Sequence, residues 1–266
     1  MGFSFIHRTE SYVICAFLFI GMILMFIAGR ALSNKGKYQS FEMKGGVSSV
    51  HSALYGLFAF ILAFAFSLSG QRYDYTRSVL IDESNAIGTA VLRCDLYKDS
   101  TRNILREDFR KYLDARISMY EAPKDLPSVI SAMRITDSVG KHIWNLVTYE
   151  SKQPNMLIPS NQMIPALNEM FDMGSKRDML LRTNVPDLII YMVLILALCS
   201  SFLSGVTALN IIGRDRLIFL FFMIFSTIVI YITLDMGRPL RGVIKADVAE
   251  QAIIEIRHQL DPEWIE

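Results

Sequence analysis

The sequence predicts an all-α polytopic membrane protein with four transmembrane helices, in two hairpin pairs, and a cytoplasmic helical bundle. Four apolar stretches without Asp, Glu, Lys or Arg lie in two pairs around a charged middle segment. Each approaches or exceeds the roughly 17 to 20 residues that cross a hydrocarbon core as a helix. Elsewhere, apolar residues recur at helical steps, and no stretch alternates as a strand would. We therefore divide the chain into two transmembrane helices (1–70), a cytoplasmic helical domain (71–187), two further transmembrane helices (188–236) and a C-terminal cytoplasmic helix (237–266).

The composition agrees with a membrane protein and argues against several other classes. Of the 266 residues, 52% are hydrophobic, and the mean hydropathy is +0.32. A net charge of +1 gives no support for a nucleic-acid partner. Three cysteines do not suggest a disulfide framework, and the four histidines lack the spacing of zinc ligands. We expect no cofactor and no metal.

The first pair of predicted spans is Tyr12–Gly29 and Val50–Gly70. Arg8 precedes the first of them, as a basic residue does in a signal peptide. However, no cleavage site leads into a soluble chain, and a second span follows at once. We therefore interpret Tyr12–Gly29 as a retained membrane span.

The second pair is Leu188–Gly213 and Leu217–Leu234, joined only by Arg214–Arg216. Gly213 is expected to close the preceding helix, as glycine often does. An even number of spans places both termini and the middle segment on one side of the membrane. Basic residues beside the spans are slightly more numerous on that side, which favours the cytoplasm, although most of the surplus flanks the long middle segment that the rule discounts.

The middle segment is predicted to be helical throughout. Ser100 is expected to cap one helix, Pro127 to start a second and Ser160 to open a third. Beyond the fourth span, Val248–Leu260 has the pattern of a last amphipathic helix. Each of these helices has one apolar face that needs a partner, so together they predict an all-α bundle.

The second span has a pattern with two interpretations. Small residues follow one side of it, and phenylalanines occupy the remaining arc. Close packing against other helices accounts for such a pattern. Alternatively, the span lines a conduit, and one of two phenylalanines four residues apart forms a hydrophobic constriction that gates by dewetting. The pore-lining candidates are Phe60, Ala63, Phe64, Ser67 and Gln71.

Charged residues gather where the second and fourth spans end: Arg72, Asp74, Asp235, Arg238 and Arg241. One interpretation is a structural junction, in which Asp235 pairs with an arginine because a partly buried lone charge is costly. The other is a charged vestibule ring whose arginines attract anions. Asp74 follows Arg72 by two residues, about 200° around a helix. If Arg72 faces the lumen, Asp74 should therefore point away from it.

Two segments carry a family resemblance: RYDYTRSVLIDESNAIGTAVLRCDL, which begins at Arg72, and LDMGRPLRGVI, which begins at Leu234. They resemble the bestrophin-like family, whose members are mostly bacterial membrane proteins, and the order of spans fits along nearly the whole chain. The family-motif residues are Glu83, Asn85, Gly88 and Thr89. Met236–Gly237 departs from the Asp-x-Asp-Arg-Pro form of the family, which leaves the partner of Asp235 open.

The resemblance implies kinship with bestrophins, which are oligomeric anion channels with four spans per subunit, cytoplasmic termini and a hydrophobic neck on the second span. Phe60 and Phe64 resemble that neck. Calcium gating is not implied, because the acidic residues after the last span are dispersed. We therefore expect a multi-pass protein of the bacterial inner membrane with cytoplasmic termini. Its expected partners are the lipid bilayer, inorganic ions and copies of itself in a homo-oligomer, a tetramer or pentamer.

Two functions stay open at this point. The first is an oligomeric ion channel, anion-conducting, with the second span around a central pore. The second is a non-conducting membrane scaffold or sensor whose cytoplasmic helices bind a partner, because these helices hold a large share of the chain. The spans lack ionisable residues at their centres, which weakens ion-coupled transport. An enzyme is not expected, because no catalytic constellation or phosphate-binding loop is present.

Overall fold

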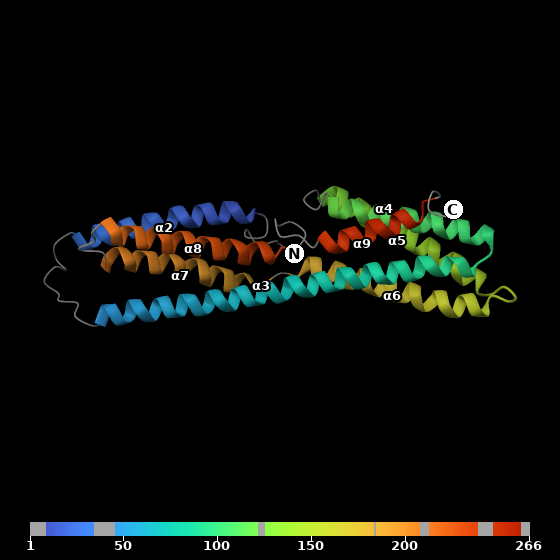
Figure 1. Cartoon of the computed structure of the whole chain (residues 1–266), viewed down its shortest axis with the longest axis horizontal. Helices are drawn as coiled ribbons and strands as arrows, with labels where there is room; N and C mark the ends of the chain where they lie inside the picture. Colours follow the sequence, from blue (N-terminus) through green and yellow to red (C-terminus); the bar gives the residue numbers. More distant parts are fainter. Residues whose placement is uncertain are drawn as a thin grey trace. The chain divides into compact units, whose positions relative to one another are not determined.

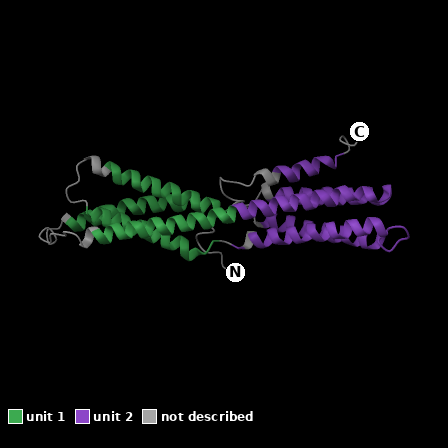
Figure 2. Ribbon diagram, turned by 60° about the horizontal axis from the view of Figure 1, so that its bottom comes forward, with its two compact units in different colours: residues 1–73, 184–238 green, residues 74–183, 239–266 purple. Residues whose placement is uncertain are grey.

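The computed structural model describes residues 9–34, 46–121, 126–183, 185–207, 213–238 and 247–261. These residues form eight α-helices and one 3-10 helix, and no strand occurs among them. The predicted all-α class is therefore confirmed. The helices are labelled in Figure 1. The chain divides into two compact units, residues 1–73 with 184–238 and residues 74–183 with 239–266 (Figure 2), and each is described by itself.

The first unit contains the apolar helices. They are α2 (Ser11–Asn34), the first part of α3 (Gly46–Leu92), α7 (Asp187–Thr207) and α8 (Gly213–Met236). All four are long and apolar enough to cross a membrane. Each predicted span falls on one of them, so the four-span prediction is confirmed. A helix satisfies its own backbone hydrogen bonds, which is what a segment in lipid requires.

Two glycines bring α2 and α7 into close contact. A Cβ atom on Gly29 would lie 2.2 Å from the carbonyl oxygen of Phe202, and one on Gly205 would lie 2.1 Å from that of Phe26. Any side chain at either position would therefore separate the two backbones. This is the small-residue packing by which membrane helices associate.

Four hydroxyl groups of α7 and α8 are satisfied within their own helices. Ser201, Ser204, Thr227 and Thr233 each donate to the carbonyl oxygen four residues earlier, over 2.6 to 2.9 Å. A hydroxyl bonded in this way is inexpensive to bury. These residues therefore need no role in ion passage to explain their presence in the spans.

The second unit is a helical bundle with one core. It contains the rest of α3, η1 (Arg93–Leu96), α4 (Asp99–Glu121), α5 (Leu126–Glu150), α6 (Leu157–Arg182) and α9 (Asp247–Gln259). Its core is built from completely buried side chains of five of these helices: Leu80, Ile87, Leu105, Phe109, Ile143, Met163, Met170 and Ile253. The apolar faces of the predicted amphipathic helices therefore pack against one another.

Several predicted helix ends are wrong. Gly213 does not close the third span, because it is the first residue of α8, and α7 ends at Thr207. Ser100 and Ser160 lie inside the first turns of α4 and α6, which begin before them. In α6 the backbone N–H of Ser160 already donates to the carbonyl of Met156, at 3.0 Å. These helices begin without the side-chain caps that the sequence suggested.

Candidate functional site

The predicted pore-lining residues share one exposed face of α3. Phe60 is 68% exposed and Phe64 49%, and Ala63, Ser67 and Gln71 are also exposed. The Gln71 side-chain amide donates to the Ser67 hydroxyl at 3.1 Å. We call the residues Phe60, Ala63, Phe64, Ser67 and Gln71 the α3 face. None of the other described residues of the chain buries it.

The opposite side of α3 packs against the other helices of the first unit. Phe58, Leu62, Ala65 and Ser69 are buried there. They follow one another at three- and four-residue steps, as one side of a helix does. The Phe58 ring packs edge-on against that of Phe222 in α8, with centroids 6.2 Å apart. The subunit thus fixes the orientation of α3 and leaves the α3 face outward.

The small residues in the first part of the second span, Ser52, Gly56 and Ala59, are here called the small-residue stripe. All three are exposed, and outside the surrounding helix no atom of the described residues lies within 4 Å of a Cβ built on Gly56. Farther along the same span, a Cβ on Gly70 would lie 3.7 Å from Cε of Met236, so that glycine does face another helix. Gly29 and Gly205 lie at backbone contacts between helices. The stripe therefore remains available to a partner outside the chain.

Arg72 and Asp74 lie on different sides of α3. The Arg72 Nε donates to the carbonyl oxygen of Gly237, at 3.3 Å, and the Arg72 side chain is half-buried. Asp74 is exposed and follows Gln71 by three residues, so it continues the α3 face. The vestibule alternative placed Arg72 at the lumen; in the structure, Asp74 lies on the same side of α3 as Phe60 and Phe64.

Of the other three charged residues of the proposed vestibule, the structure describes two, Asp235 and Arg238. Asp235 is buried near the end of α8. Arg238 donates from Nη1 to the carbonyl oxygen of Thr9, at 2.6 Å. Arg241 lies outside the described residues. Arg72 and Arg238 thus each bind a backbone carbonyl next to a helix end, as expected for a structural junction.

Glu83, from the family motif, is the centre of a buried ion cluster. It is completely buried. Its Oε1 lies 3.1 Å from Nη2 of Arg116 on α4, and its Oε2 lies 3.6 Å from Nε of Arg177 on α6. Asp178 adds a second carboxylate, 3.0 Å from Nη2 of Arg177 and 3.7 Å from Nη1 of Arg116. Opposite charges must lie together here because burying one alone is very costly. The cluster thereby ties α3 to α4 and α6.

Tyr112 completes the buried cluster. Arg116 donates to its hydroxyl oxygen from Nη2 at 3.1 Å. Burial raises the pKa of the Tyr112 phenol, an effect that the positive charge of Arg116 partly offsets. The phenol is therefore neutral at physiological pH and accepts a hydrogen bond without adding charge.

The remaining motif residues lie in different surroundings. Asn85 is exposed, while Gly88 and Thr89 are half-buried. A Cβ on Gly88 would lie 3.4 Å from Cδ1 of Ile256 on α9, an ordinary contact. The motif residues therefore do not form one site; Glu83 alone reaches the cluster.

Sequence reasoning missed Arg116, Arg177 and Gly174. A Cβ on Gly174 would lie only 2.5 Å from Nη2 of Arg116, so the cluster needs a glycine there. The available signal was spacing: Arg177 continues the buried steps of α6 through Met170 and Gly174. A charged residue at a core position of an amphipathic helix indicates a buried partner.

No metal site is evident in the part of the chain that the structure describes. No group of three or more His, Cys, Asp or Glu side chains that could hold a metal ion occurs there.

The chain is similar to known proteins in both sequence and fold. The family model of the Bestrophin-like domain matches residues 15–250. A comparison with curated protein sequences gives no significant match. Several solved structures, by contrast, have the same fold.

Three of these structures illustrate the similarity. A bacterial bestrophin homolog from Klebsiella pneumoniae with a tryptophan-to-alanine mutation has a TM-score of 0.69 at 14% identity, over 94% of this chain and 99% of that chain. The homolog solved by Zn-SAD phasing has a TM-score of 0.68 at 14% identity, over 91% and 98%. A membrane protein with a serine-to-alanine mutation has a TM-score of 0.69 at 14% identity, over 95% and 98%. These likenesses show a shared fold. Because the family model covers residues 15–250, the chain belongs to the Bestrophin-like family.

Proposed function

We propose that the chain is one subunit of a homo-oligomeric ion channel and that the α3 face lines its pore. The observation that carries this proposal is the composition of that face. It passes from Phe60 and Phe64 to Ser67, Gln71 and Asp74 without leaving one side of the helix. Lipid would accept the phenylalanines but not the polar continuation, whereas a pore with a hydrophobic constriction and a wet mouth accepts both.

The small-residue stripe supports an oligomer. Ser52, Gly56 and Ala59 are exposed although small residues in membrane helices favour close helix contacts. A neighbouring copy of α3 would use the stripe and would turn the α3 face toward a central axis. A homotetramer or homopentamer of the bacterial inner membrane, with cytoplasmic termini, is the assembly that we propose.

Anion conduction is the ion preference that the bestrophin resemblance implies, and the charges on α3 make it testable. Asp74 continues the α3 face, so several copies around an axis would repel anions and attract cations. Arg72 is held on Gly237. We therefore expect Asp74→Asn to raise chloride permeability relative to potassium, and Arg72→Gln to leave this ratio unchanged.

The test is reversal-potential measurement on the purified protein in planar bilayers with asymmetric KCl. Currents whose chloride-to-potassium permeability ratio responds to Asp74→Asn but not to Arg72→Gln support a pore on the α3 face. If the wild-type channel already selects potassium, the proposal of a pore on the α3 face would stand, but the anion assignment would be wrong. The absence of any single-channel current across a range of pH, voltage and salts would overturn the channel proposal.

A membrane scaffold or sensor is the second candidate, because the second unit has a complete core of its own. It gains over the channel if the particle imaged in detergent is a monomer, or an oligomer whose spans are packed solid along its axis.

A further inference from the structure

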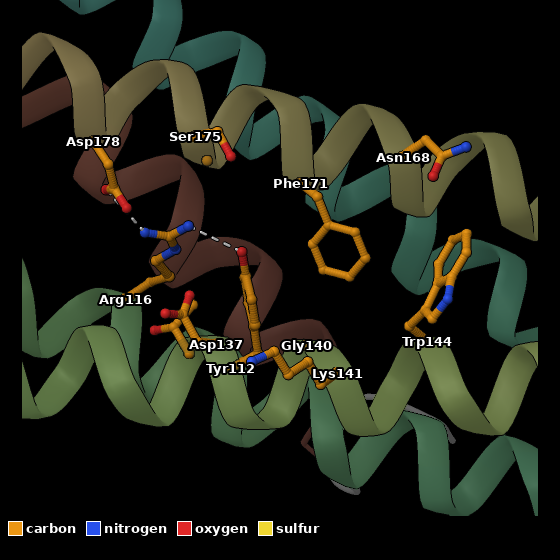
Figure 3. A pocket seen from close by; sticks show the side chains of 12 residues that line it. Tyr112, Arg116, Asp137, Gly140, Lys141, Trp144, Asn168, Phe171, Ser175 and Asp178 are labelled. Atoms are coloured by element: carbon orange, nitrogen blue, oxygen red, sulfur yellow. Dashed lines mark hydrogen bonds and ion pairs between the residues drawn. The ribbon is translucent and has the colours of Figure 1, made fainter.

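A cavity of about 480 Å³ opens in the second unit between α5 and α6, and buried Tyr112 and Arg116 of α4 contribute to its lining. It is separate from the α3 face. Figure 3 shows the side chains that line it. Its volume falls within the range of about 300 to 1,000 Å³ that is usual for small-molecule sites.

The cavity has a charged end and an aromatic end. Asp137 and Trp144 lie seven residues apart on α5, and Phe171 and Asp178 lie seven apart on α6. Seven residues are two helical turns, about 10 Å along the axis. The two helices are consecutive, and the rings of Trp144 and Phe171 lie together, with centroids 6.3 Å apart. Figure 3 accordingly shows Asp137 and Asp178 at one end and the two rings at the other.

Both signs of charge are available at or near the charged end. Arg116 is 5% exposed, and its buried Nε has no hydrogen-bond partner among the described residues. Asp178 is 30% exposed. Asp137 and Lys141 are exposed, and neither side chain has an ion-pair or hydrogen-bond partner among the described residues. A ligand that brought the complementary charges would satisfy groups that the fold leaves open.

The aromatic end is suited to a flat apolar group. Trp144 and Phe171 are both half-buried and meet edge to face, with an interplanar angle of 63°. Gly140 lies beside them; a Cβ there would be 3.0 Å from Cε1 of Phe171. The missing side chain keeps space between the rings and the charged end. A third ring could add favourable edge-to-face contacts as well as buried area.

We propose that this cavity binds a small zwitterion with an aromatic side chain, which is the chemistry of an aromatic α-amino acid. Its carboxylate binds Arg116 and Lys141, its ammonium group lies between Asp137 and Asp178, and its ring packs against Trp144 and Phe171. The two charged contacts explain why carboxylates and cations line the same end. The aromatic contact explains why the other end has no charge.

Binding is measured on the full-length protein in detergent by the fluorescence of Trp144, in a Trp264→Phe background that removes the other tryptophan. Three probes share one ring: L-phenylalanine, phenethylamine without the carboxylate, and 3-phenylpropionate without the ammonium group. We expect L-phenylalanine to bind most tightly. Each analogue should bind weaker by on the order of tenfold or more, because it loses a charge-assisted hydrogen bond.

Two variants assign the charges. Asp137→Asn should weaken the binding of L-phenylalanine but not that of 3-phenylpropionate. Lys141→Gln should weaken the binding of L-phenylalanine but not that of phenethylamine. Asp172→Asn is the control, because Asp172 is an exposed carboxylate of α6 outside the cavity. The proposal fails if no probe gives a saturable signal, if one analogue binds as tightly as L-phenylalanine, or if Asp172→Asn has the effect of Asp137→Asn. The measurement uses no current, so it stands apart from the channel proposal.

Discussion

At the scale of single residues, Gly174 leaves little room for a side chain beside the buried ion cluster. Its Cβ would lie 2.5 Å from Nη2 of Arg116. Gly174→Ala should therefore displace the guanidinium group and lower the free energy of unfolding by about 1–3 kcal/mol. The check is the thermal unfolding midpoint in detergent. Gly56→Ala is the matched control and should not lower the midpoint, because outside the surrounding helix no described atom lies within 4 Å of a Cβ there. Equal effects would contradict this account.

Glu83 gives a second prediction about the same cluster. Glu83→Gln leaves Arg116 and Arg177 buried with Asp178 as their one remaining carboxylate within the described cluster. Removing one partner from a buried ion pair costs about 3–5 kcal/mol. We therefore expect a large drop in the unfolding midpoint for Glu83→Gln and almost none for Glu169→Gln, which changes an exposed glutamate of α6. A Glu83→Gln protein as stable as wild type would show that the cluster contributes little.

Residue-level prediction from the sequence reached Glu83 but not its partners. The family motif singled out Glu83 but did not predict its burial. Arg116 and Arg177 lie on helices far along the chain. Helical periodicity identifies an apolar face, yet it does not say which faces meet. The pairing of Glu83 with Arg116 and Arg177 could therefore not be predicted from the sequence.

At the scale of elements, the helical periodicity of α3 gives a testable prediction. If the α3 face lines a pore, Ser67→Cys and Gln71→Cys should react with a charged thiol reagent and block current. Ala65→Cys and Ser69→Cys should not, because both positions are buried. The background is Cys199→Ser, since Cys199 is the exposed one of the three cysteines. Block without this periodicity would mean that α3 does not line the pore.

Phe60 tests the constriction itself. Phe60→Ala should raise open probability, because a smaller side chain removes a dewetting barrier, while ion preference stays the same. Single-channel recording measures both quantities. Phe66→Ala is the control, because Phe66 is also exposed but lies away from the α3 face. A changed ion preference with unchanged open probability would contradict the assignment.

The elements were predictable in type and much less so at their ends. Charge-free apolar runs identified all four spans, because lipid imposes that composition. The predicted caps of α4 and α6 were wrong because Ser100 and Ser160 lie inside the first turns, and the residue before α6, Met156, makes no side-chain cap. The extent of α3 also exceeded its apolar run: the helix continues from Gly46 to Leu92.

At the scale of the whole molecule, the small-residue stripe predicts how subunits associate. Ala59→Leu should weaken the oligomer without unfolding the subunit, because a larger side chain separates neighbouring helices. Native mass spectrometry should show four or five copies for the wild type and smaller species for the variant. Ala31→Leu, at an exposed alanine of α2, should leave the mass unchanged. A wild-type monomer would remove the basis for a shared pore.

The last helix of the chain has a consequence for how the protein is made. Ile253 and Leu260 are buried in the core of the second unit, yet the ribosome reaches α9 only after α7 and α8. During synthesis, the parts of α3 and α4 that α9 covers therefore stay exposed while two more hydrophobic segments enter the bilayer. Exposed apolar surface of this kind attracts chaperones and proteases. A chain released before α9 would carry that surface permanently, so cellular quality control can distinguish finished subunits from truncated ones before they assemble.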